Sequence, residues 1–272
     1  MDWLDTMVGT LELWQVLTLV GVGLLSGALG GMLGIGGGVV NIPMLTLLVG
    51  VPIHLAQAAS MCVTPFVAGA AALGHHQKRM VCVPLLIRLL PAAVIFLIAG
   101  VSASIWIEAW WLELIFGVFL IWVAFIHTRK LISGARIAPD QLAKLSWARA
   151  SVVAGCFGFG AGLLGIGGGL ITVPLLGILC RLPLRQCIAT SSAVMVITSI
   201  IGAIYKNVTL GQTPDLPQWV EWWTPLEYAA WLIPSCLGSS WCAARLSHRL
   251  PLRAIRMVFV VLVLIAAWRL LV

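Results

Sequence analysis

The chain has 272 residues and a formal net charge of +7, with 61% hydrophobic and only 9% charged residues. A soluble domain carries about 25% charged residues, so this composition excludes a soluble protein and predicts an all-α polytopic membrane protein. The basic residues lie in short segments between apolar ones, which argues against a nucleic-acid partner. The seven cysteines contain no CxxC pair, so we expect small buried residues, no metal site and no cofactor.

Apolar segments that are long enough to enter a membrane follow one another along the chain. Crossing a hydrocarbon core of about 30 Å takes roughly 20 helical residues, so segments 38–50 and 169–180 are too short and are expected to be half-helices. The first segment begins after Asp2, Asp5 and Glu12 without a basic leader, which favours a structural helix over a signal peptide. The remaining expected spans are 14–34, 55–74, 84–103, 109–127, 150–166, 187–205, 226–246 and 256–272.

Lysine and arginine residues predict the orientation. Segment 128–149 is placed in the cytoplasm because it carries Arg129, Lys130, Arg136, Lys144 and Arg149. Counting the predicted membrane crossings outward from this segment places both termini on the extracytoplasmic side. Only two basic residues, Lys206 and Arg269, then fall on that side. We expect each half to hold one re-entrant hairpin and three spans, so the two halves are predicted to be inverted.

A glycine-rich motif occurs once in each half. Gly-Ile-Gly-Gly-Gly stands at Gly34–Gly38 and again at Gly165–Gly169, followed five residues later by Pro43 and Pro174. The wider match pairs Gly31–Leu45 with Gly162–Leu176 at a shift of 131 residues. We therefore take residues 1–130 as the first repeat, 131–149 as a cytoplasmic linker and 150–272 as the second repeat.

Three consecutive glycines do not hold a regular helix in lipid, since each costs about 1 kcal/mol relative to alanine. Their backbone amides must face protein, water or a ligand. A helix that restarts after the break points its N–H groups at the break and favours an anion there. The predicted substrate-binding residues at the breaks are Gly36, Gly37, Gly38 and Asn41 in the first half, and Gly167, Gly168, Gly169 and Thr172 in the second.

Hydroxyl residues follow both hairpins and add donors for a substrate oxygen. Ser60 in the first half matches Ser191 in the second, where Thr190 and Ser192 flank it. Because the first half has Ala59 and Met61 at those flanking positions, substrate specificity is expected to depend mainly on the second half. An ordinary helix–helix hydroxyl contact is the alternative for these residues.

The glycines have two other interpretations. They can simply allow helices to pack closely, as small residues do in membranes. They do not form a nucleotide-binding P-loop, because the lysine and the Ser/Thr of that motif are missing.

The double motif, GMLGIGGGVVNIPML and GLLGIGGGLITVPLL with the downstream ATSS stretch, resembles the duplicated signature of TauE/SafE sulfite-exporter-like permeases. This resemblance implies a secondary transporter of small sulfur-containing anions, such as sulfite, an organosulfonate or thiosulfate. It also implies a multi-pass protein of a cell membrane, expected to be a bacterial inner membrane.

Several points stay open at this stage. The alternatives to a transporter are a passive anion channel and, less favoured, an integral-membrane enzyme; the composition shows no cluster of catalytic residue types, so we expect no enzyme. The expected partners are a small anionic substrate and the lipid bilayer. The exact anion, the direction of transport, a coupling ion, a homodimer and the number of full spans are not determined by the sequence.

Overall fold

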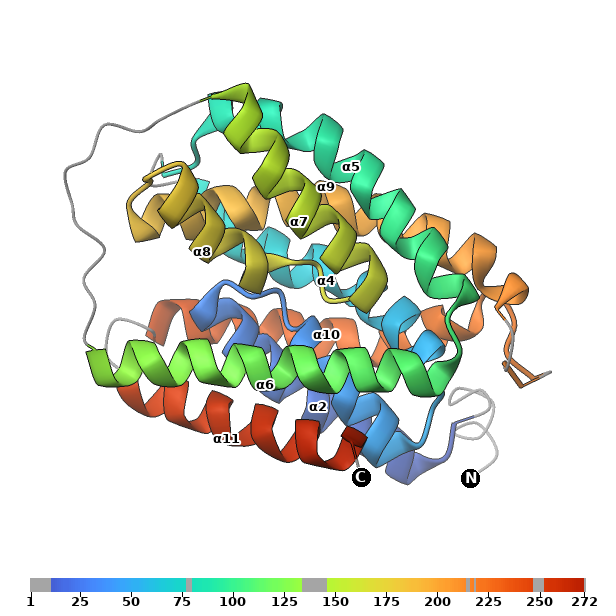
Figure 1. Cartoon of the computed structure of the whole chain (residues 1–272). Helices are drawn as coiled ribbons and strands as arrows, with labels where there is room; N and C mark the ends of the chain where they lie inside the picture. The colour runs from blue at the N-terminus through green and yellow to red at the C-terminus, as the bar shows by residue number, and fades with distance from the viewer. Residues whose placement is uncertain are drawn as a thin grey trace.

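The computed structural model describes residues 11–76, 80–133, 146–213, 216–217, 219–246 and 252–271. All regular secondary structure in these ranges is helical (Figure 1). The first half contains α2 (Leu13–Leu33), α3 (Gly38–Met44), the π-helical turn η1 (Leu45–Val49), α4 (Ile53–His76), α5 (Val83–Trp106) and α6 (Ala109–Ser133). The second contains α7 (Trp147–Leu164), α8 (Gly169–Leu179), α9 (Leu184–Thr209), the 3-10 turn η2 (Leu210–Gln212), α10 (Thr224–Leu246) and α11 (Leu252–Leu271).

Helices lie at all the spans predicted from hydropathy, although α10 and α11, at the predicted spans 226–246 and 256–272, are not among those long and apolar enough to cross a membrane within the described residues. Six of them are long and apolar enough to cross a membrane among the described residues, namely α2, α4, α5, α6, α7 and α9. Gly38–Val49 and Gly169–Leu179 are shorter apolar helices, as expected for half-helices. The protein is thus a multi-pass membrane protein. Most of the basic segment that was placed in the cytoplasm lies outside the described residues.

Two helix pairs pack through small residues. A Cβ added at Gly27 of α2 would overlap the carbonyl of Cys236 on α10, and one added at Gly158 of α7 would overlap the carbonyl of Ala93 on α5. Only a residue without a side chain permits this approach, which is the packing role of small residues in membranes. Gly27 and Gly158 are separated by the same 131 residues as the two motifs.

The packing of the remaining elements places α4 and α9 in the middle of the bundle. These two helices pack on each other, α4 also contacts α3 and α10, and α9 contacts α8 and α5. α6 packs along α11, and Figure 1 shows this pair along one side of the molecule. The start of α2 and the end of α11 lie at the same end of the bundle (Figure 1). The inverted orientation of the halves in a membrane stays a prediction.

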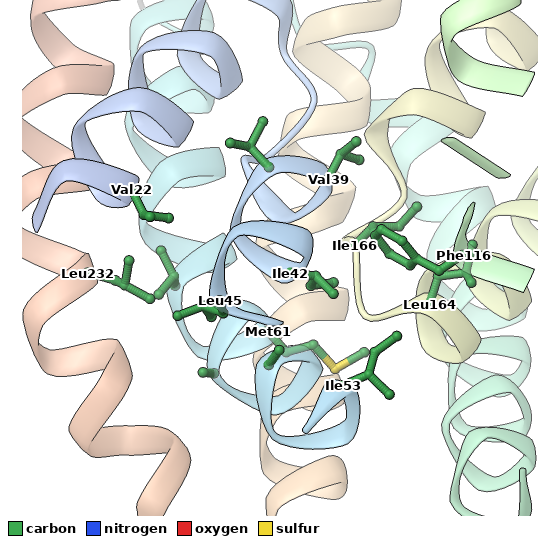
Figure 2. Packing of buried hydrophobic residues seen from close by; sticks show 14 of the residues in the cluster. Val22, Val39, Ile42, Leu45, Ile53, Met61, Phe116, Leu164, Ile166 and Leu232 are labelled. Carbon is green, nitrogen blue, oxygen red and sulfur yellow. The ribbon is translucent and has the colours of Figure 1, made fainter. Parts of the chain in front are cut away.

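Residues of both glycine hairpins pack in the same hydrophobic core. One buried cluster includes Ile35 and Ile42 from the first hairpin and Ile166 from the second. Figure 2 shows Ile166 beside the helical turn that carries Val39 and Ile42. The glycine motifs therefore lie in the interior of the protein and not on its lipid-facing surface.

Candidate functional site

Each glycine motif breaks the chain between a full helix and a half-helix. Gly34 and Gly165 end α2 and α7 with φ of 69° and 71°. Gly37 and Gly168 then precede α3 and α8 with φ of 78° and 80°. A residue with a Cβ in this left-handed region costs about 1–2 kcal/mol, so the repeated glycines make the two sharp turns possible. We call Gly34–Gly38 the first break and Gly165–Gly169 the second break.

The two breaks touch each other. A Cβ built on Gly38 would lie 2.9 Å from the Cα of Ile166, and one built on Gly169 would lie 2.8 Å from the carbonyl oxygen of Gly34. In both cases the neighbour is backbone, which cannot move aside as a flexible side chain can. The start of each half-helix is thus packed on the other break.

The first turn of each half-helix has amide groups with no helical acceptor. The first backbone bonds of α3 run from Val40 and Asn41 to Gly37, and those of α8 run from Ile171 and Thr172 to Gly168. No side chain caps either helix. The preceding amides at both starts are the ordinary unsatisfied donors of a helix N-terminus, and here they lie in a shared interior region.

Three polar side chains of the first half surround this region with unused hydrogen-bonding atoms. Asn41, Gln57 and Ser60 are fully buried. Among the described residues, neither side-chain atom of Asn41 has a partner, and the Oε1 of Gln57 and the hydroxyl of Ser60 have none. The nitrogen of Gln57 donates to the carbonyl of Leu163 across the bundle at 3.2 Å. Buried polar groups without partners are uncommon in folded proteins, and such groups mark a place for a ligand or water.

The predicted residues of the second half are buried as well, but most have internal partners. Thr172 donates to the carbonyl of Gly168 at 2.9 Å, and Ser191 donates to the sulfur of Met195 at 3.7 Å. Thr190 accepts a bond from the backbone N–H of Cys82 at 3.1 Å, so its hydroxyl ties α9 to the segment before α5. Ser192 is buried. These contacts do not add support to the prediction that second-half hydroxyls set substrate specificity. Whether any of these residues contacts a ligand stays a prediction.

Three side chains that were not predicted from the sequence also lie against the breaks. A Cβ on Gly167 would be 2.5 Å from the methyl of Thr64, 3.3 Å from Met195 and 3.4 Å from the hydroxyl of Ser199. The Ser199 hydroxyl has no partner within the described part of the chain. Thr64 and Met195 occupy equivalent positions at the 131-residue shift, four residues after Ser60 and Ser191, and that spacing was a usable signal.

Lys206 differs from its sequence-based placement. It was expected outside the membrane, beyond a span ending near residue 205, but α9 continues to Thr209. The side chain is fully buried, and its Nζ donates to the hydroxyl of Ser104 on α5 at 2.8 Å. Lys206 therefore faces the neighbouring helices and not solvent.

The described residues contain no group of three His, Cys, Asp or Glu side chains that could hold a metal ion. The breaks supply backbone amides, and hydroxyl and carboxamide side chains lie beside them; all of these are hydrogen-bond donors suited to an oxyanion. Residues 34–43 and 164–170 are all buried, so both breaks lie inside the protein.

Comparison with known proteins agrees with this arrangement. The family profile "Sulfite exporter TauE/SafE" matches residues 19–270. The chain is 24% identical to the probable membrane transporter protein MamO of Paramagnetospirillum magneticum over 93% of its length and 44% of MamO, and 25% identical to MamO of Magnetospirillum gryphiswaldense over 90% and 44%. It therefore spans less than half of these relatives.

A probable membrane transporter protein of Methanocaldococcus jannaschii is 30% identical over 68% of this chain and 70% of that protein. No solved structure matches the chain. Because the family profile covers nearly the whole chain, including both breaks, this protein belongs to the sulfite exporter TauE/SafE family.

Proposed function

We propose that the protein is a secondary membrane transporter of small sulfur-containing anions, of the sulfite, organosulfonate or thiosulfate type. Its family and the names of its relatives support a membrane transporter. It carries out no chemical reaction. The substrate is held where the first and second breaks meet, between the starts of α3 and α8.

The observation that carries this proposal is the coincidence of two uncapped helix starts with unpartnered donors. A helix N-terminus carries about half a positive charge, and two such ends that converge stabilise an anion without a charged side chain. Asn41, Gln57 and Ser60 are fully buried there and have polar atoms without partners. An oxyanion would accept hydrogen bonds from the amide of Asn41 and the hydroxyl of Ser60.

Alternating access follows from two related halves. The packing of α2 on α10 has its counterpart in α7 on α5, and the contact of α3 with α4 has its counterpart in α8 with α9. This agreement supports a repeat at residues 1–130 and 150–272, and the charge distribution is what favours an inverted relation between the halves. Rocking of the helices around the α2–α10 pair against those around the α5–α7 pair would open the buried site to one side of the membrane at a time.

The substrate class is tested by ligand-dependent stability of the purified full chain. Sulfite, thiosulfate, sulfoacetate, taurine, sulfate and chloride are compared at equal ionic strength, because a ligand that binds only the folded state raises the melting temperature. We expect the largest rise with a sulfur oxyanion. No rise with any of the sulfur compounds would contradict the proposed substrate class.

Flux into liposomes separates a transporter from a channel. We expect uptake that saturates with concentration and is stimulated by unlabelled substrate on the opposite side, because alternating access exchanges one bound anion at a time. Uptake that rises linearly with concentration and shows no such stimulation would favour the passive channel.

A further inference from the structure

Lys206 presents a buried positive charge that the breaks do not use. Its side chain is fully buried. An ammonium group has three N–H donors, and the hydroxyl of Ser104 takes one of them at 2.8 Å. That hydroxyl donates its own proton to the carbonyl of Val101 at 2.7 Å, so Ser104 positions Lys206 and cannot compensate its charge.

No acidic side chain in the described part of the chain pairs with Lys206. His54 lies at the start of α4, the helix that packs on α9. His54 is itself buried, and neither ring nitrogen makes a hydrogen bond of normal geometry within the described residues. An ammonium that is buried without a counter-charge is strongly unfavourable, so the charged form of Lys206 needs an anion beside it.

The position of Lys206 relates it to the breaks. Lys206 follows Ser199 by seven residues on α9, which is two helical turns on the same face and about 10 Å along the axis. Ser199 lies against the second break, whereas Lys206 lies one turn from the end of α9 at Thr209. The same face of α9 thus leads from the breaks toward the end of the bundle.

We propose that Lys206, together with His54, forms a second binding site for a small anion, separate from the site at the two breaks. The ammonium supplies the charge, Ser104 orients it, and a ring N–H of His54 would donate a further hydrogen bond to the anion. The anion is either the transported substrate, held before it reaches the breaks or after it leaves them, or chloride from the medium that acts as a fixed counter-ion. Only the first source rests on the proposed transport function.

Calorimetric titration of the full chain in nanodiscs of neutral lipid tests this site. Sulfite and chloride are the probes, in a gluconate buffer of constant ionic strength. We expect Lys206→Met to remove one binding event or weaken it by at least about tenfold, while Arg269→Gln, which removes an exposed arginine of α11, leaves the titration unchanged. Ser104→Ala keeps the charge and should weaken the same event to a smaller extent.

Asn41→Ala separates the two sites. If it removes the other binding event and leaves the one that depends on Lys206, both sites exist. If Asn41→Ala leaves the titration unchanged while Lys206→Met abolishes all binding, the result supports the Lys206 site and contradicts the site at the breaks. Chloride that displaces sulfite from the Lys206 site identifies the counter-ion source, and sulfite binding that chloride does not affect identifies the substrate source. Wild-type titrations for both Lys206→Met and Ser104→Ala in folded protein would overturn the proposal.

Discussion

The first and second breaks have nearly the same backbone but different surroundings. Gly37 and Gly168 share a left-handed φ of 78° and 80°. A Cβ on Gly37 would meet nothing closer than the carbonyl oxygen of Ser26 at 3.4 Å, whereas one on Gly168 would overlap the ring of Phe157. Ser26 and Phe157 are equivalent positions at the 131-residue shift. The repeat has thus preserved the turn, while the residues around it have diverged.

The divergence extends to hydrogen bonding. Asn41 has two side-chain atoms without partners, but its equivalent Thr172 is bonded to the carbonyl of Gly168. Gln57 reaches across the bundle toward Leu163, and its equivalent is the apolar Ile188. The first break is the polar side of the proposed site and the second break is the packed side, so mutations at equivalent positions should have unequal effects.

The largest difference is expected between Gly168→Ala and Gly37→Ala. The first adds overlap with Phe157 to backbone strain, which together cost about 2–5 kcal/mol of unfolding free energy. The second adds only the strain, about 1–2 kcal/mol. Denaturant unfolding in a mixed micelle measures both. Equal losses would show that the space around the two turns does not differ as described.

Where the breaks contact each other, equivalent mutations should instead behave alike. Gly38→Ala and Gly169→Ala each push a methyl against backbone of the other break, at 2.9 Å and 2.8 Å, and should each cost about 1–3 kcal/mol and stop transport. Gly21→Ala is the control, since a Cβ there meets nothing within 4 Å. Transport at the wild-type rate in either variant would argue against close contact of the breaks.

A smaller effect is expected at Thr190. Thr190→Val removes the acceptor of the Cys82 amide and should lower the unfolding free energy by about 1 kcal/mol, with anion affinity kept. Ser192→Ala serves as the neighbouring control. A Thr190→Val protein of normal stability that has lost about tenfold in affinity would place the Thr190 hydroxyl on the ligand instead.

The sequence predicted the helices well because the physical cause is local. Long apolar runs must form helices in lipid, where backbone groups need internal partners, and the short runs after each motif could not span. The span predicted to end near residue 205 continues as α9 to Thr209. Hydropathy did not indicate the burial of Lys206, because the hydroxyl of Ser104 that it contacts comes from another helix.

The breaks could be located from the sequence, but their inequality could not. The repeated glycines mark both turns, and Asn41 and Ser60 were selected from the repeat alone. Which polar atoms remain without partners depends on contacts between helices, such as Gln57 with Leu163 and Thr190 with Cys82. Hydropathy and spacing carry no information on such pairs, so the weight given to the second half stays a prediction.

The central claim is that an anion binds at the polar side of the two breaks. The most direct test is to measure the affinity of two matched double variants for the anion. Asn41→Ala with Ser60→Ala removes side chains whose polar atoms are unpartnered, and Thr172→Val with Ser191→Ala removes their bonded equivalents. Loss of hydrogen bonds to a charged ligand costs about 1.5–3 kcal/mol, so the first variant should bind the preferred anion at least about tenfold more weakly. The second should stay within about twofold of wild type. A first-half variant that is folded and binds with wild-type affinity would contradict the claim.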